Sequence, residues 1–169
     1  MTRDQIHTAF QRLNEELRNQ GIRGEIGVVG GAAMVLAFNA REATKDVGAV
    51  FEPSIKIREI AKAVSAELGL PPGWINDAVK DFMSAPPEQR QVLLDLSHLS
   101  VWMPPAQYLL AMKAISARYD SNDAADLRTL ITHLKIKSVE QVFELIEHYY
   151  PRKLIPAKTQ FFLEELFEG

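Results

Sequence analysis

The chain contains no cysteine among its 169 residues. This absence excludes disulfide bonds, thiolate catalysis and cysteine-ligated zinc, and it is compatible with a reducing compartment. The sequence also lacks an apolar run long enough to cross a bilayer. Its opening residues, MTRDQIHTAF, carry early charge and lead into no apolar segment of the secretory-signal kind. We therefore predict a cytoplasmic protein with no membrane partner.

A strong charge of either sign is missing as well. The 19 basic and 22 acidic residues give a net charge of -3, so no long-range field favours nucleic acid as a general partner. Metal-ligand spacing is also missing among the histidines, which disfavours a histidine-based zinc site; these are His7, His98, His133 and His148. The length and the apolar content of 47% fit an ordinary globular domain.

The pattern of apolar residues predicts an α+β fold. Strands cluster in the first hundred residues and helices dominate the rest, which disfavours a Rossmann-like series. We expect residues 1–103 to form the α+β core and residues 104–169 to form a helical part packed on it as one compact unit. The expected strands lie at 26–29, at 47–51 and in a hairpin within 91–103 that turns near Ser97 and His98. The expected helices lie at 6–17, 32–38, 53–68, within 74–82, at 105–118, from a cap at Ser121 or Asn122 to 133, from a capping box of Ser138 and Gln141, and up to 167.

The segment GGAAMVLAFNAREATKDVGAVF holds the first functional pattern. Gly30 and Gly31 end one expected strand, and Asp46 opens the next, fifteen positions after Gly31. This arrangement resembles the nucleotidyltransferase fold, in which the glycine pair lets the backbone approach nucleotide phosphates. The next strand of that fold carries an acid, an apolar residue and a second acid, so both acids point to one side. The resemblance implies a small mixed sheet and an Mg²⁺ ion that binds the triphosphate.

Asp46 supplies the first acid of this pattern, but the position of the second acid is Gly48. One carboxylate holds Mg²⁺ far less well than two, because the ion keeps most of its water and needs charge to be held. Two explanations stay open. The protein is a degenerate relative, or an Asp-to-Gly change has disarmed a toxic activity. Because glycine weakens strands, the second explanation is slightly favoured.

The segment YLLAMKAISARYDSNDAADLRTL resembles the helical part of toxin-type nucleotidyltransferases related to abortive-infection proteins of type IV toxin–antitoxin systems. Those proteins share a lysine on one helix and an acid-x-x-Asp-Leu pattern that opens the next helix. Lys113 matches the lysine, and Asp123, Asp126 and Leu127 match the pattern. The resemblance implies that Lys113 contacts nucleotide phosphates and that a downstream Asp assists deprotonation of the attacking hydroxyl. The predicted catalytic residues are therefore Asp46, Lys113 and Asp123.

Purely structural interpretations stay open at each of these positions. The two glycines can simply end a strand, and Asp46 can be an ordinary acid at a strand start. Lys113 can lie on a solvated helix face, and Asp123 can stabilise a helix N-terminus through the helix dipole. The connection between the two expected strands either lines the nucleotide site or is ordinary surface; its candidate binding residues are Arg41, Thr44 and Lys45.

Three other residues receive a structural interpretation. Asp95, between two leucines, has the form of the superfamily's third strand acid, but we favour an outward position on an edge strand. Trp74 and Trp102 are predicted to lie in the core or at an interface, because no basic stripe surrounds them as it would around base-stacking residues.

The leading functional hypothesis is a toxin that transfers a nucleotide from an NTP–Mg²⁺ complex to a hydroxyl acceptor. The resemblance favours a tRNA 3′ end over a protein side chain as acceptor, and it implies an antitoxin protein as partner. Gly48 predicts that the activity is impaired in this chain. A non-catalytic module that recognises a nucleotide or a protein is the alternative, with Gly48 as its best support. A helical scaffold is a third interpretation, but it leaves the glycine pair and Asp46 unexplained.

Overall fold

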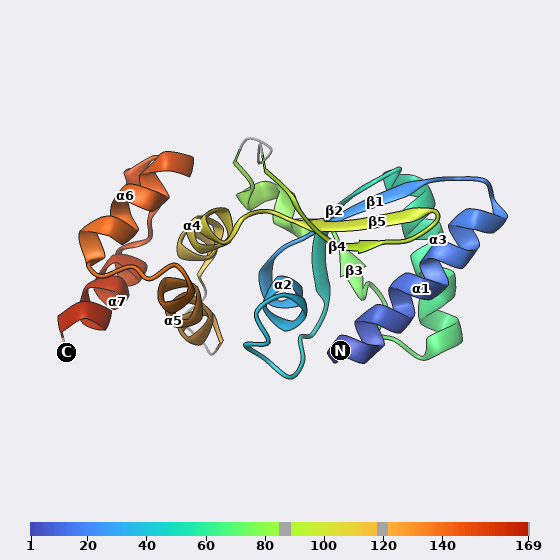
Figure 1. Cartoon of the computed structure of the whole chain (residues 1–169), viewed down its shortest axis with the longest axis horizontal. Coiled ribbons are helices and arrows are strands. Elements are labelled where there is room, and N and C mark those ends of the chain that lie inside the picture. Colours follow the sequence, from blue (N-terminus) through green and yellow to red (C-terminus); the bar gives the residue numbers. More distant parts are fainter. Residues whose placement is uncertain (85–88, 118–121, 169) are drawn as a thin grey trace. The chain divides into compact units, whose positions relative to one another are not determined.

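The computed structural model describes residues 1–84, 89–117 and 122–168 (Figure 1). The chain divides into two compact units, the first formed by Met1–Asp81 and Arg90–Pro104 and the second by Phe82–Gln89 and Pro105–Gly169. The first unit holds the sheet, and the second is helical. The predicted α+β fold is confirmed. The candidate cap Ser121 lies outside the described residues.

The first unit is built on a mixed sheet with the strand order β3-β2-β1-β5-β4. The central strand β1 pairs antiparallel with β2 and parallel with β5. The short strand β3 pairs parallel with β2, and β4 pairs antiparallel with β5. The predicted hairpin is thus confirmed, and the strands expected at 26–29 and 47–51 pair with each other. The strands are β1 (Gly24–Val28), β2 (Val47–Glu52), β3 (Ile75–Asn76), β4 (Gln91–Asp95) and β5 (Leu99–Met103).

Helices α1 (Arg3–Asn19) and α3 (Ser54–Leu68) cover one face of this sheet. A Cβ atom added to Gly24 of β1 would meet Leu17 of α1 and Ile57 of α3, which places both helices on the same side. The apolar stripe of α1 is completely buried, as its spacing predicts. A capping box of Thr2 and Gln5 starts α1.

The segment 74–82 differs from the predicted short helix. Residues Ile75 and Asn76 extend the sheet by pairing with Val47 and Gly48, and only Ala78–Phe82 form a 3₁₀ turn, η1. The physical reason is that backbone N–H and C=O groups need hydrogen-bond partners. The open edge of β2 provides these partners, whereas a helix this short is only marginally stable. Trp74 anchors the segment by donating its indole N–H to the Ala61 carbonyl at 2.9 Å.

The second unit consists of helices α4 (Ala106–Ser116), α5 (Asp123–His133), α6 (Val139–Tyr149), the 3₁₀ turn η2 (Arg152–Leu154) and α7 (Ala157–Glu168). Helix α4 packs on α5 and α6, and α6 packs on α7. Ser138 caps α6 as predicted, but the Gln141 side chain accepts from the Lys137 N–H, so the reciprocal half of the box is missing. Asn122 precedes α5 without the predicted side-chain cap bond.

The segment at 82–84 is held by two tyrosines of this unit. The Tyr150 hydroxyl donates to the Phe82 carbonyl and accepts from the Ser84 N–H, and the Tyr108 hydroxyl donates to the Ser84 carbonyl. Burial raises the pKa of Tyr150 well above its usual value, so this hydroxyl stays protonated. No helix in the described part of the chain is both long enough and apolar enough to span a membrane.

Candidate functional site

The predicted glycine pair forms the junction between β1 and α2 (Gly30–Leu36). Gly30 has a left-handed backbone with φ of 60°, a conformation that strains any residue with a Cβ atom. Gly31 is constrained by space instead, because an added Cβ would lie 2.5 Å from Thr44 Oγ1 and 3.1 Å from Arg41 Nη1. The structure therefore brings Gly31, Arg41 and Thr44 together, as predicted residues of one site.

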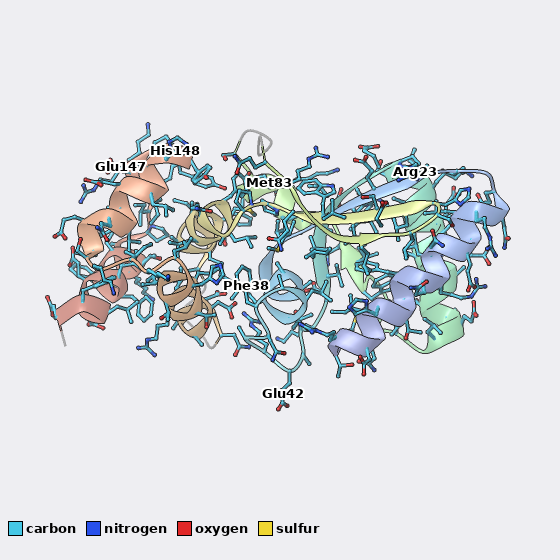
Figure 2. All side chains as sticks on the ribbon, viewed as in Figure 1. Arg23, Phe38, Glu42, Met83, Glu147 and His148 are labelled. Carbon is cyan, nitrogen blue, oxygen red and sulfur yellow. The ribbon has the colours of Figure 1, made fainter. Side chains whose placement is uncertain are left out.

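The loop between α2 and β2 is fastened to the start of the chain. The Thr44 N–H donates to the Met1 carbonyl at 2.9 Å, and the amino group of Met1 donates to the Thr44 carbonyl. The Thr44 hydroxyl donates to the Asp46 carbonyl at 3.1 Å, so it faces Gly31 in a fixed orientation. Lys45 is exposed on the same loop, and Glu42 projects outward from its tip (Figure 2).

Asp46 is exposed immediately before β2, and its carboxylate has a partner that the sequence did not reveal. Asn76 donates its side-chain N–H to Asp46 Oδ2 at 2.8 Å, while its own Oδ1 accepts from the Ala78 N–H at 3.3 Å. The parallel register places Asn76 beside Gly48 on the neighbouring strand. Asn76 is thus a positioning residue for the Asp46 carboxylate.

Asp46 precedes β2 by one residue, and its carboxylate lies on the side of Gly48, because Asn76, the register partner of Gly48, donates to it. A Cβ atom at this position would lie 2.9 Å from Cγ1 of Val79 on η1. A second acid therefore requires Val79 to move. Position 48 is not an open place from which a side chain has merely been deleted.

Asp77 holds the η1 turn that carries Val79. Its carboxylate accepts hydrogen bonds from Arg58 of α3 and from Lys80. The Lys80 hydrogen bond and the charges of Arg58 and Lys80 lower the pKa of Asp77, although partial burial opposes the shift. Arg58 and Lys80 are exposed, with 56% and 49% of their side chains accessible against 18% for Asp77, so each ion pair contributes modestly to the placement of η1.

The side chains at this corner do not fit a two-carboxylate Mg²⁺ site. Among the described residues, no group of three or more His, Cys, Asp or Glu side chains is arranged to hold a metal ion. Asp46 offers one carboxylate, and an Asn76 N–H donor points at that carboxylate. Mg²⁺ needs oxygen ligands in near-octahedral geometry, and a donor N–H cannot serve as one.

Lys113 of α4 lies in a buried ion cluster of the second unit. Its ammonium contacts Asp123 Oδ1 at 2.8 Å and Asp126 Oδ2 at 2.6 Å, both on α5. Lys113 is 7% exposed and Asp126 1%, so the interpretation of a solvated lysine is wrong. The three residues form the lysine cluster, whose formal charge is -1 when all are ionised. A phosphate that reached this ammonium would compete with both carboxylates for it.

The remaining predictions concern residues outside these two groups. Asp95 lies at the exposed end of the edge strand β4, where Arg23 contacts it at 3.5 Å, so its outward position is confirmed. Trp74 and Trp102 are buried, with exposed fractions of 1% and 7%. The pairing registers place Asp95 in one row with Ser100, Glu25 and Glu52, which is the face of the sheet that carries Asp46. Asp95 lies three strands away from β2, however, so the two carboxylates are too far apart to share one ion.

Comparison with known protein families identifies the family to which the chain belongs. A family described as "Nucleotidyltransferase of unknown function (DUF6036)" matches residues 4–155. The chain belongs to this family. The match includes both the Gly30–Asp46 segment and the lysine cluster, so the nucleotidyltransferase resemblance is confirmed at the level of the family. No curated protein and no solved structure matches the chain.

Proposed function

We propose that this nucleotidyltransferase-family protein binds a nucleoside triphosphate at the glycine corner, defined as Gly30, Gly31, Arg41, Thr44 and Asp46. The observation that carries the proposal is the packing of the Arg41 guanidinium and the Thr44 hydroxyl against Gly31, which has no side chain. A cation and a hydroxyl beside bare backbone suit phosphate oxygens. The family match supports the same assignment.

The reaction we assign to the active form is nucleotidyl transfer to a hydroxyl acceptor. The acceptor oxygen forms a bond to the α-phosphorus, the bond to pyrophosphate breaks, and the hydroxyl proton passes to a base. Such chemistry depends on positioning and charge stabilisation more than on covalent help. Arg41 and Thr44 would orient the phosphates. Asp46 would supply one of the two acids that the family reaction needs, so the Gly48 form is impaired.

Lys113 and Asp123 can take their proposed roles only if one acid of the lysine cluster separates from the Lys113 ammonium. Asp123 is the more exposed of the two acids, with 29% of its side chain accessible against 1% for Asp126. Asp123 is therefore the acid that could leave Lys113 and accept a proton. The toxin role, the tRNA acceptor and an antitoxin partner extend this proposal, and they rest on the resemblance of the Lys113–Leu127 segment.

A non-catalytic nucleotide-binding module is the second candidate, and the packing of Val79 over Gly48 favours it. A site adapted to a second acid at position 48 would leave room for that side chain. In this structure a Cβ atom added to Gly48 would lie 2.9 Å from Cγ1 of Val79. In this case the glycine corner binds a nucleotide, and the protein acts by binding it without catalysing a transfer.

One set of variants separates the two candidates. Val79→Ala makes room for a side chain at position 48. In this Val79→Ala background, Gly48→Asp adds the second acid, and Gly48→Asn adds a side chain of the same shape without the charge. Each folded variant is incubated with Mg²⁺ and α-labelled NTPs, with bulk tRNA as the acceptor. We expect transfer from the aspartate variant and little from the asparagine variant or from Val79→Ala alone. A folded aspartate variant without Mg²⁺-dependent transfer would overturn the catalytic candidate.

Thermal unfolding with each NTP tests binding independently of transfer. A ligand at a hundred times its Kd stabilises the folded state by about 2.7 kcal/mol, which is readily measured as a rise in Tm. We expect NTPs to stabilise the unaltered protein and Arg41→Ala to reduce that effect. If no NTP stabilises either the unaltered protein or the aspartate variant, nucleotide binding is rejected together with both candidates.

A further inference from the structure

Trp102 lies flat on the face of the sheet because its neighbour is a glycine. Gly27 of β1 is the register partner of Trp102 on β5. A Cβ atom at Gly27 would lie 2.3 Å from Cζ2, 2.6 Å from Cη2 and 2.7 Å from Cε2 of the indole. Any larger residue at position 27 would push the ring away from the sheet. One face of the indole thus rests on the backbone of the central strand.

Arg90 covers the indole from the other side. Its Cζ atom lies 4.1 Å from the centre of the Trp102 ring. Arg90 also forms an ion pair with Glu25 at 3.4 Å, and the two side chains are 46% and 58% exposed. Exposed cation–π contacts and exposed ion pairs are both weak. The cover over Trp102 is therefore one that a ligand can displace.

Trp102 shares its face of the sheet with Asp46 and Gly48. The pairing registers place Trp102, Gly27 and Val50 in one row across three strands. Directly paired residues share a face, and alternate residues along β2 do so too, so Val50 continues to Gly48 and Asp46. Two strand spacings separate Trp102 from Val50 by about 10 Å, and Asp46 lies about 14 Å further along β2. The separation of Trp102 from Asp46 is therefore about 17 Å, which only an extended nucleotide with its triphosphate chain can bridge.

We propose that Trp102 is the stacking platform for the base of a bound nucleotide and that the base displaces Arg90. This inference rests on the proposed nucleotide binding and adds a base subsite to it. A planar ring fixed on one side by Gly27 loses little freedom when a base stacks on its other side. A guanidinium already occupies the stacking position, which marks that face as accessible to planar groups. Stacking tolerates any base, so the subsite provides affinity more than base selection.

Calorimetric titration of the full chain tests the subsite. The probes are the four NTPs and inorganic tripolyphosphate, which carries the phosphates but no base. Trp102→Leu is expected to weaken NTP binding roughly tenfold, a typical value for one stacked base, and to leave tripolyphosphate binding unchanged.

Arg90→Ala is expected to strengthen NTP binding about three-fold, because the base no longer competes with an exposed cation–π contact. Arg23→Ala removes an exposed arginine of the same unit and should change neither affinity.

The outcomes separate this inference from the proposed function. NTP affinities that stay unchanged in both Trp102→Leu and Arg90→Ala overturn the base subsite alone. Arg90→Ala that weakens NTP and tripolyphosphate binding equally also overturns it, because Arg90 would then be a phosphate ligand. If Trp102→Leu does not fold, Arg90→Ala decides, since its side chain is exposed. The absence of NTP binding in the unaltered protein overturns the subsite and the proposed function together.

Discussion

The glycine corner and the lysine cluster were both predicted from motif resemblance, yet their physical environments are opposite. At the glycine corner, Asp46 is exposed, its partner is a neutral amide, and the position of the second acid is a glycine. In the lysine cluster, the cation and Asp126 are almost completely buried, and each is satisfied by an opposite charge. The first group is open to a ligand, and the second is closed on itself.

This difference shows which of the two residue groups is explained by folding stability and which is better explained by function. Buried charges must be paired, so the residues of the lysine cluster are already explained by the packing of α4 on α5. The glycine corner has no such explanation, because the left-handed Gly30 costs conformational entropy and the exposed Asp46 contributes little to stability. We therefore place more functional weight on the glycine corner than on Lys113.

The largest expected effect is the loss of the buried acid in the lysine cluster. Asp126→Ala should lower the free energy of unfolding of the helical unit by about 3 kcal/mol, because it leaves a buried lysine with one acid. Urea unfolding followed by far-ultraviolet circular dichroism measures the change. The matched control Asp123→Ala should cost less than about 1 kcal/mol, since that acid is more exposed. Equal costs for the two variants would show that burial does not distinguish the acids.

An intermediate effect is expected from the glycines of the corner, which differ in what constrains them. Gly31→Ala should destabilise the protein by about 1–3 kcal/mol, because its Cβ overlaps Thr44 and approaches Arg41. Gly30→Ala has open space and should cost about 1 kcal/mol for its positive φ.

A double variant sharpens this test. Thr44→Ala removes the hydroxyl that the added methyl group would meet, so Gly31→Ala combined with Thr44→Ala should recover part of the lost stability without recovering NTP affinity. Chemical denaturation and calorimetry measure the two properties separately. Full recovery of NTP affinity in the double variant would mean that the Thr44 hydroxyl does not contact the nucleotide.

The sequence predicted the elements that have a strong local period. The spacing of Ile6, Phe10, Leu13 and Leu17 alone indicates α1, and the apolar runs on either side of Ser97 and His98 indicate the β4–β5 hairpin. These signals depend on neighbours along the chain, so they can be read without knowledge of the tertiary structure.

The parts that were missed depend on strand register and on distant packing. Asn76 reaches Asp46 only because β3 pairs with β2, and a strand of two residues has no pattern of its own. Val79 over Gly48 follows from the same pairing. The spacing of Asp123 and Asp126 predicts that they share a helix face, but no local signal shows that Lys113 is buried between helices. The contact of Trp102 with Gly27 likewise joins residues far apart in sequence.

The smallest expected effect is a pH dependence at the turn that carries Val79. Lys80 and Arg58 lower the pKa of Asp77 in the folded protein below its usual 3.8. The ionised Asp77 therefore stabilises the fold at neutral pH, and this contribution is lost as the pH falls below 3.8 through the folded-state pKa. Asp77→Asn should lower Tm slightly at pH 7 and flatten its decline in acid, with a difference that shrinks at high salt. Asp81→Asn removes an exposed acid from the same turn and serves as the control for net charge. A steep acid decline that persists in Asp77→Asn would mean that other contacts hold η1, and Val79 would then stay over Gly48 even when this ion pair is broken.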